Sequence, residues 1–239
     1  MTHCSIIVPV LNEAGEIEGL LRHLKALPGA ASAEVIVVDG DAAGDTLQAV
    51  RAPGVIRLRA PVGRARQMNA GAASARGSIL LFLHADARLP ENALPMIHET
   101  MGNPAFVGGA FDLGIRSDRR SYRLIAAVAS LRSRLTRIPY GDQAIFLDRA
   151  CFERLGGYPD IPLMEDVALM RRVKREGMRI HILPSRVSTS PRRWEAEGIL
   201  WTTLRNWTLL ALYGAGVPPA TLARHYRSGK AVYERPQAD

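Results

Sequence analysis

The 239-residue chain has few cysteines, few aromatic residues and no apolar run long enough to cross a bilayer. Its two cysteines, Cys4 and Cys151, are too few and too far apart for a disulfide framework or a zinc cluster. The first residues lack the basic segment and the long apolar stretch of a secretory signal. We therefore expect a reducing, cytoplasmic location. The apolar stretch 207–217 leaves two alternatives: it packs against the domain, or it lies on the inner face of the membrane.

Glycine-rich nucleotide motifs are also missing. Neither the fingerprint of dinucleotide-binding proteins nor a Walker loop occurs, which argues against an oxidoreductase or an NTPase. The net charge of +8 is concentrated in two segments: residues 116–137 hold seven Arg and one Asp, and residues 171–193 hold eight basic residues and one Glu. This distribution favours an anionic partner or solvated helix faces. Nucleic acid is not expected, because the Arg clusters lack interleaved aromatic residues.

Short apolar, β-branched runs alternate with helical patterns in the first half of the chain. Residues 5–10, 35–38, 55–58 and 79–83 are strand candidates with amphipathic segments between them. This alternation predicts an α/β fold: a single domain with a mainly parallel central sheet and helices on both faces. Ligands of such sheets bind at the carboxyl ends of the strands.

Acidic residues follow two of these strands. Asp86 comes after the strand at residues 79–83, and Mg²⁺ or Mn²⁺ held by one or two carboxylates and by diphosphate oxygens would explain a carboxylate there. A helix N-cap or an ion pair is the alternative. Asp39 ends the strand at residues 35–38, where it would contact a base or ribose, or take part in a turn.

Two helical segments add further candidates. Gly63 opens a segment with Arg64 and Arg66 and with small residues, a composition that suits a helix facing phosphate. Glu165 and Asp166 precede a second amphipathic helix. Paired acids at a helix start either stabilise that helix end or supply a base that deprotonates an acceptor nucleophile.

Taken together, the motifs resemble the family 2 glycosyltransferases, which have the GT-A fold. They occur in order as Ile-Val-Pro-Val-x-Asn-Glu at residues 7–13, Val-Val-Asp-Gly at 37–40, Asn-Ala-Gly at 69–71, His-Ala-Asp at 84–86, Gly-Gly-Tyr at 156–158 and Glu-Asp at 165–166. The sequences of four segments resemble those of a small bacterial subgroup known as radical-SAM or arsenosugar-associated transferases: residues 63–71, 81–86, 141–143 and 190–194.

The resemblance implies that residues 1–105 bind a nucleotide sugar and that residues 106–195 bind the acceptor and carry catalysis, and we expect residues 196–239 to form a C-terminal helical extension. The resemblance also implies roles for particular residues. Asp166 would be the general base, with Glu165 assisting acceptor binding, and Asp86 would hold the divalent cation. The residues implied or expected to bind the nucleotide are Pro9, Val10, Glu13, Asp39, Arg64, Arg66, Asn69 and Ala85. The residues expected on the acceptor side are Asp142, Gln143, Arg192, Arg193 and Trp194.

Three departures from the family pattern stand out. His84 replaces the first aspartate of Asp-x-Asp, so metal binding would depend on Asp86. Residues 39–46 lack the serine of the usual Asp-Gly-Ser-x-Asp-Gly-Thr, and Met68 stands where many relatives have Arg. Arg64 or Arg66 would then contact the diphosphate.

The resemblance implies an inverting, metal-dependent transfer of one sugar from a nucleotide-diphosphate donor, with a UDP-sugar favoured. The acceptor would be a small or lipid-linked molecule, and an anionic one would suit the basic segments. Two alternatives remain: a sugar nucleotidyltransferase, and a protein that binds nucleotide sugars or a membrane without catalysis. The first lacks the basic glycine-rich loop after the first strand, since residues 11–15 contain no Arg or Lys.

Overall fold

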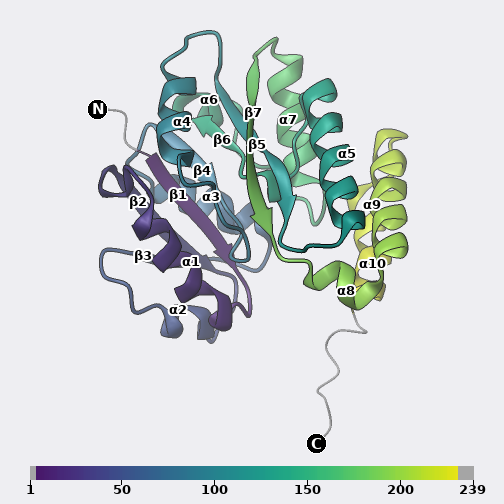
Figure 1. Ribbon diagram of the computed structural model, residues 1–239, viewed down its shortest axis with the longest axis horizontal. Helices are drawn as coiled ribbons and strands as arrows, with labels where there is room; N and C mark the ends of the chain where they lie inside the picture. The colour runs from purple at the N-terminus through teal and green to yellow at the C-terminus, as the bar shows by residue number, and fades with distance from the viewer. Residues whose placement is uncertain (1–3, 231–239) are drawn as a thin grey trace, which may run out of the picture.

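The four apolar runs of the N-terminal half form neighbouring parallel strands, β1 (Cys4–Val10), β2 (Ala33–Asp39), β3 (Ile56–Arg59) and β4 (Ile79–Phe82). In the computed structural model, which describes residues 4–230, they belong to one seven-stranded sheet of order β3-β2-β1-β4-β6-β5-β7 (Figure 1). The predicted strands are confirmed to within one or two residues at each end.

Three later strands complete the sheet: β5 (Gly108–Ile115), β6 (Phe146–Asp148) and β7 (Ile180–Thr189). The short β6 runs antiparallel to both β4 and β5, whereas β7 runs parallel to β5. Gly108 and Gly109 let β5 approach its neighbours closely, because a Cβ at either position would collide with a backbone oxygen of the adjacent strand. The sheet is therefore mainly parallel, as predicted, with one antiparallel insertion.

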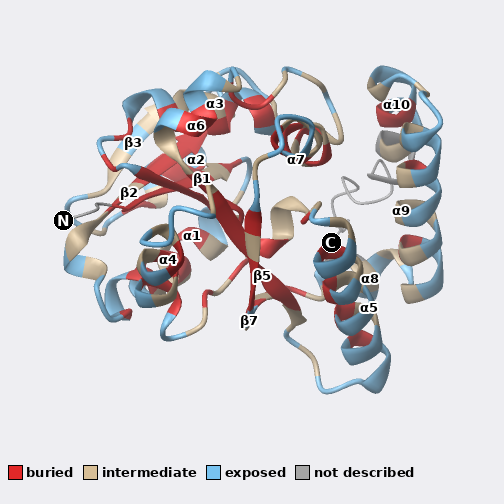
Figure 2. Cartoon of the chain, turned by 90° about the horizontal axis from the view of Figure 1, so that it is seen from above, coloured by how far each residue is buried: buried red, intermediate tan, exposed pale blue. Residues whose placement is uncertain are grey.

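Alternating side chains of the strands fill two apolar layers, one on each face of the sheet. On one face, Ile6 and Val8 pack with α1 (Ala14–Ala26), α2 (Asp45–Ala49) and α4 (Ala93–Met101). On the other, Ile7 packs with α3 (Arg64–Ser74), α6 (Arg149–Arg154) and α7 (Glu165–Arg175). Gly71 brings α3 close to β1, because a Cβ there would lie 2.5 Å from Ile7 Cγ2. Figure 2 shows this buried sheet between its helices, which confirms the predicted α/β class.

The remaining helices lie at the end of the molecule away from β3 (Figure 1). They are α5 (Arg120–Thr136), which packs on β5, followed by α8 (Arg192–Glu197), α9 (Ile199–Gly214) and α10 (Pro219–Lys230). Short 3-10 turns occur at η1 (Ala30–Ser32) and η2 (Gly141–Gln143). Within residues 4–230, no helix has both the length and the apolarity needed to cross a membrane. The last nine residues of the predicted C-terminal extension lie outside the described residues.

Candidate active site

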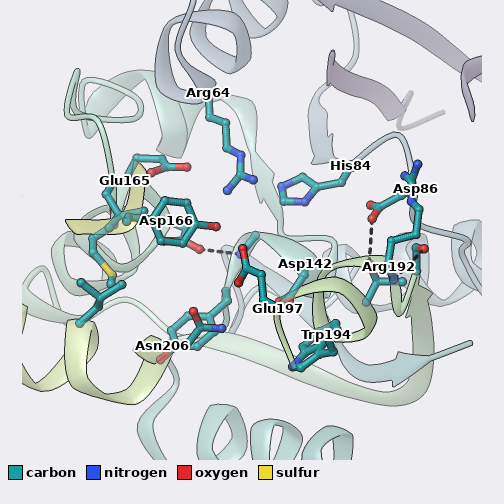
Figure 3. A pocket seen from close by; sticks show the side chains of 18 of the residues that line it. Arg64, His84, Asp86, Asp142, Glu165, Asp166, Arg192, Trp194, Glu197 and Asn206 are labelled. Carbon is teal, nitrogen blue, oxygen red and sulfur yellow. Dashed lines mark hydrogen bonds between the residues drawn. The ribbon is translucent and has the colours of Figure 1, made fainter. Parts of the chain in front are cut away.

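A cavity of about 600 Å³ opens at the carboxyl ends of the strands. Glu13 follows β1, while His84 and Asp86 follow β4, so residues far apart in sequence meet at one edge of the sheet. Arg64 enters from the start of α3, and the acid pair of α7 lies opposite Asp86 (Figure 3). Helices α8 to α10 form the remaining wall. The predicted position of the site is the position of this cavity.

The acid pair consists of two carboxylates in different environments. Glu165 is 6% exposed, and burial raises its pKa to about 7, with a further increase from Asp166 and a decrease from the Arg64 guanidinium. Asp166 is held by backbone N–H groups: Gly141 N donates to its Oδ2 over 2.6 Å, and Val167 N donates to its Oδ1 over 2.7 Å. One carboxyl therefore takes up a proton near neutral pH, and the other is fixed in direction.

Gly141 keeps the centre of the cavity open. A Cβ at this position would lie 3.1 Å from His84 Nε2 and 3.5 Å from Asp166 Oδ2. The first distance is shorter than most Cβ contacts, and the second is an ordinary van der Waals contact. A side chain at this position would therefore require a small shift of the His84 imidazole.

Arg64 and Arg66 point in different directions, as residues two apart on a helix do. Arg64 lines the cavity. Burial lowers the pKa of Arg64, but nearby acids, Glu165 first, outweigh this effect and raise it. Arg66 instead donates from Nε to the exposed Asp160, 2.8 Å from its Oδ1. Of these two guanidinium groups, only Arg64 faces the acid pair.

Asp86 lies on the wall opposite the acid pair, on the same side of the cavity as His84 (Figure 3). Its Oδ2 accepts a long hydrogen bond of 3.4 Å from Thr189 Oγ1. Glu13 also lines the cavity and is close enough for the Asp86 carboxylate to raise its pKa. Burial raises the pKa of Glu13, Arg192 at 3.6 Å opposes this effect, and the Asp86 carboxylate adds to it. This is a region where a cation would relieve the repulsion between two carboxylates.

The carboxylates of Asp86 and Glu13 determine whether a divalent cation could bind here. In the part of the chain that the structure describes, no group of three His, Cys, Asp or Glu side chains encloses a metal-sized space. Residues 4–230 therefore form no metal cage from protein ligands alone. Asp86 and Glu13 do provide the one or two carboxylates with which Mg²⁺ or Mn²⁺ binds when phosphate oxygens and water complete its shell.

Several residues predicted to bind nucleotide do not line the cavity. Asp39 is fully buried, and its carboxylate accepts hydrogen bonds from Asp41 N (2.9 Å) and Leu47 N (3.3 Å), the turn role that the sequence left open. The Val10 carbonyl accepts a hydrogen bond from buried Gln67. Pro9 is partly buried in β1 beside it. Nucleotide contacts by these three predicted residues stay predictions.

Asn69, Ala85 and Gln143 also lie outside the cavity lining. Asn69 joins α3 to the Gly-Gly-Tyr segment, since its amide donates to Tyr158 O over 2.8 Å and accepts from Tyr158 N over 2.9 Å. Ala85 is 4% exposed. Gln143 is fully buried, accepting from Ser133 Oγ and donating to the Phe111 carbonyl. These contacts give Asn69 and Gln143 structural roles, and any ligand contact stays a prediction.

Among the predicted acceptor-side residues, Asp142, Arg192 and Trp194 do line the cavity. The side chain of Arg193 lies outside the described residues. The indole of Trp194 packs edge-on against Tyr122, with ring centroids 6.2 Å apart. Within residues 4–230, its buried Nε1 has no hydrogen-bond acceptor.

The helical wall also contains residues that the sequence did not indicate. Glu197 of α8 forms a buried ion pair with Arg205 of α9, whose guanidinium lies 4.9 Å from the centre of the Tyr226 ring of α10. Glu197, Asn206 and Tyr226 all line the cavity. No local motif marks them, because only the packing of the three helices brings them to the site.

The fold and this strand-edge site define a GT-A glycosyltransferase. The chain belongs to glycosyl transferase family 2, whose model matches residues 5–155. Comparison with curated proteins gave no match. The structure is similar to that of the mannosyltransferase PcManGT from Pyrobaculum calidifontis in complex with GDP-Man and Mn²⁺, with 25% identity and a TM-score of 0.63 over 78% of this chain and 56% of that one.

Two structures of Staphylococcus aureus TarS residues 1–349 share the fold. One, in complex with UDP-GlcNAc, is 18% identical, with a TM-score of 0.61 over 79% of this chain and 58% of that one. The other is 16% identical, with a TM-score of 0.60 over 98% of this chain and 73% of that one. The chain thus spans little more than half the length of the mannosyltransferase and of the first TarS structure.

Proposed function

We propose that the chain is an inverting glycosyltransferase that moves one sugar from a nucleotide-diphosphate donor to a hydroxyl group of an acceptor. The observation that carries this proposal is the position of Arg64, which faces the Glu165–Asp166 pair in the same cavity as Asp86. A cation held at Asp86 and the fixed Asp166 carboxylate would then lie on opposite sides of the space where the sugar would react. Family membership supports the same reaction class.

The donor would bind along the strand-end wall, with its diphosphate between Arg64 and Asp86. Asp86, assisted by Glu13, would hold Mg²⁺ or Mn²⁺, which neutralises charge on a departing diphosphate. The Mn²⁺ and GDP-Man bound to PcManGT support a divalent cation and a nucleotide sugar. We propose that Asp39 contacts the nucleobase of the donor. Each of its carboxylate oxygens has a second lone pair that could accept a further hydrogen bond. We propose a UDP-sugar as donor and a GDP-sugar as the competing possibility.

Asp166 would act as the general base. Its carboxylate takes the proton of the acceptor hydroxyl, and the acceptor oxygen attacks the anomeric carbon. The bond from that carbon to the diphosphate oxygen breaks, and the electron pair leaves with the nucleoside diphosphate. A single displacement inverts the anomeric carbon. Glu165, with its pKa near 7, would donate or accept a hydrogen bond that orients the acceptor.

The lining of the cavity bears on the acceptor. Two guanidinium groups, those of Arg64 and Arg192, face a larger number of acids. The acidic residues of the lining are Glu13, Asp86, Asp142, Glu165, Asp166 and Glu197. The donor and its cation would use the charges near Asp86, Arg205 pairs with Glu197, and Glu165 takes up a proton near neutral pH, which leaves no excess of positive charge at the acceptor end. We therefore propose an uncharged, hydroxyl-bearing reacting group, in place of the anionic acceptor suggested by the basic segments.

A thermal-shift screen tests the donor side. UDP, GDP and CDP are each added with and without Mn²⁺ to the wild type, to Asp86→Ala and to the exposed control Asp118→Ala. A nucleotide at one hundred times its Kd stabilises by about 2.7 kcal/mol, which raises Tm by roughly 5 to 11 °C in a chain of this size. We expect a Mn²⁺-dependent shift for one nucleotide, lost only in Asp86→Ala. No shift with any nucleotide would refute the donor assignment.

Donor hydrolysis tests the base without knowledge of the acceptor, because water replaces the acceptor hydroxyl. We expect Asp166→Asn to keep the nucleotide-dependent shift in Tm and to release nucleoside diphosphate about 10² to 10⁴ times more slowly. Proton NMR of the sugar first released should show the anomer opposite to that of the donor. Wild-type hydrolysis in Asp166→Asn, or retention of configuration, would contradict the mechanism. The cytoplasmic location and the radical-SAM-associated subgroup remain predictions.

A further inference from the structure

Large apolar side chains are exposed mainly on two helices, α5 and α9. Both views of the ribbon place these helices at the same end of the molecule (Figures 1 and 2). Elsewhere in residues 4–230, the exposed large apolar side chains are Leu11 and Val62. Each helix has its own exposed apolar face: Leu124, Val128, Leu131 and Leu135 on α5, and Leu200, Trp201, Leu204, Trp207 and Leu212 on α9.

The exposed residues of α5 form a stripe along a well-packed helix. They occur at positions 124, 128, 131 and 135, the spacing of one helix face. The opposite face is fixed to the domain: Tyr122 is fully buried, and Ser130 Oγ accepts a hydrogen bond from Leu113 N of β5. The exposure of Leu131 (57%) and Leu135 (75%) is therefore a feature of a packed helix.

Helix α9 has the same two-sided character. Thr202 and Leu209 are buried, and Asn206 and Leu209 line the cavity. On its outer side, Trp201 is 61% exposed and Trp207 is 59% exposed. Helix α9 therefore has one side that lines the cavity and one side that is exposed. The sequence left open whether residues 207–217 pack on the domain or lie on a membrane. In the structure, one face of α9 packs on the domain and the opposite face is exposed.

The charge of the segments that contain α5 and α9 indicates which kind of surface would bind their exposed faces. Residues 119–137 and 199–230 contain no Asp or Glu. Arg119, Arg120 and Arg123 are exposed at the start of the α5 stripe. Arginines beside the apolar stripe of α5, and tryptophans on the exposed face of α9, are residues typical of helices that lie in the interface of an anionic bilayer. A second copy would bring two positively charged faces together, which disfavours self-association through these faces.

We propose that the apolar faces of α5 and α9 dock the protein onto a membrane surface that contains anionic lipids. The leucines and tryptophans insert at the level of the headgroups, while the arginines at the start of α5 contact lipid phosphates. Since α9 also lines the cavity, the bound protein would hold the helical wall of the cavity, formed by α8 to α10, next to the bilayer. This proposal concerns lipid binding alone, and it holds or fails independently of glycosyl transfer.

Vesicle co-sedimentation of the full chain tests the proposal without nucleotide. Wild type, the α9 variant Leu204→Gln/Trp207→Gln and the control Val62→Gln are mixed with vesicles of phosphatidylcholine, with or without phosphatidylglycerol. We expect wild type and control to bind the vesicles with phosphatidylglycerol, more weakly as NaCl is raised. The α9 variant should bind at least tenfold more weakly, a difference of about 1.4 kcal/mol.

Three further measurements distinguish lipid binding from misfolding and from self-association. Thermal melting checks that each variant folds, and Leu131→Gln/Leu135→Gln on α5 should reduce binding in the same way. Size-exclusion chromatography tests the competing occupant. Absence of wild-type binding to phosphatidylglycerol vesicles at low salt would overturn the proposal. So would binding of the α9 variant at the level of the control, or a wild-type dimer that the α9 variant dissociates.

Discussion

Glu165 makes the stability of the protein depend on pH in a way that a single substitution can reveal. Its folded-state pKa of about 7 lies above the ordinary value of 4.5, because the side chain is buried beside Asp166. Such a carboxyl stabilises the fold fully below pH 4.5, and that contribution is lost as the pH rises through 7. The difference in pKa corresponds to about 3 kcal/mol of unfolding free energy at alkaline pH.

Glu165→Gln replaces the titrating carboxyl by a neutral group of the same shape. Its unfolding free energy, relative to wild type, should increase by about 3 kcal/mol between pH 4.5 and pH 8. This corresponds to a difference in Tm that grows by about 6 to 12 °C. Thermal melts of both proteins in chelator-treated buffers measure it, with exposed Glu91→Gln as the matched control. A difference in Tm that stays constant between these pH values would refute the assignment of a buried, protonated Glu165.

Three other substitutions test the packing and the site. Gly71→Ala should destabilise the protein by about 1 to 3 kcal/mol in denaturant unfolding, because its Cβ would lie 2.5 Å from Ile7 Cγ2; an unchanged midpoint would contradict the close packing. Arg64→Ala should weaken nucleotide binding in calorimetry by about tenfold or more, and by far more than Arg66→Ala; equal losses would remove the distinction drawn from their directions. Asn69→Ala, which loses both hydrogen bonds to the Gly-Gly-Tyr segment, should cost about 1 to 3 kcal/mol of unfolding free energy, and a neutral effect would show that the link is dispensable.

The N-terminal half of the sheet was predictable because its strands are short, apolar and separated by helices. Buried parallel strands show this pattern directly in the sequence. The strand β7 (Ile180–Thr189) was not predicted, since basic residues within it conceal the apolar pattern. The antiparallel insertion of β6 also depends on distant pairing with β4 and β5, which no local pattern encodes.

The site was predictable where strand ends and helix starts meet. Glu13, Arg64, Asp86 and Asp166 lie around one cavity because the strands that precede or neighbour them share an edge. Asp39 shows the limit of this reasoning, because the position of a residue at a strand end does not give the direction of its carboxylate. In the helical wall, Arg192 and Trp194 were predicted, whereas Glu197, Asn206 and Tyr226 were not, since only the packing of α8, α9 and α10 brings these three to the cavity.

The two walls of the cavity come from successive stretches of the chain. Everything up to the end of β7 builds the strand-end wall and the acid pair, and one connection near Ser190 leads into the helices that close the other side. A single recombination crossover at this connection would therefore replace one wall while leaving the other intact. If the helical wall binds the acceptor as proposed, chimeras of related chains joined there would change the acceptor while keeping the donor site, and gene fusion at the same point would give evolution the same route.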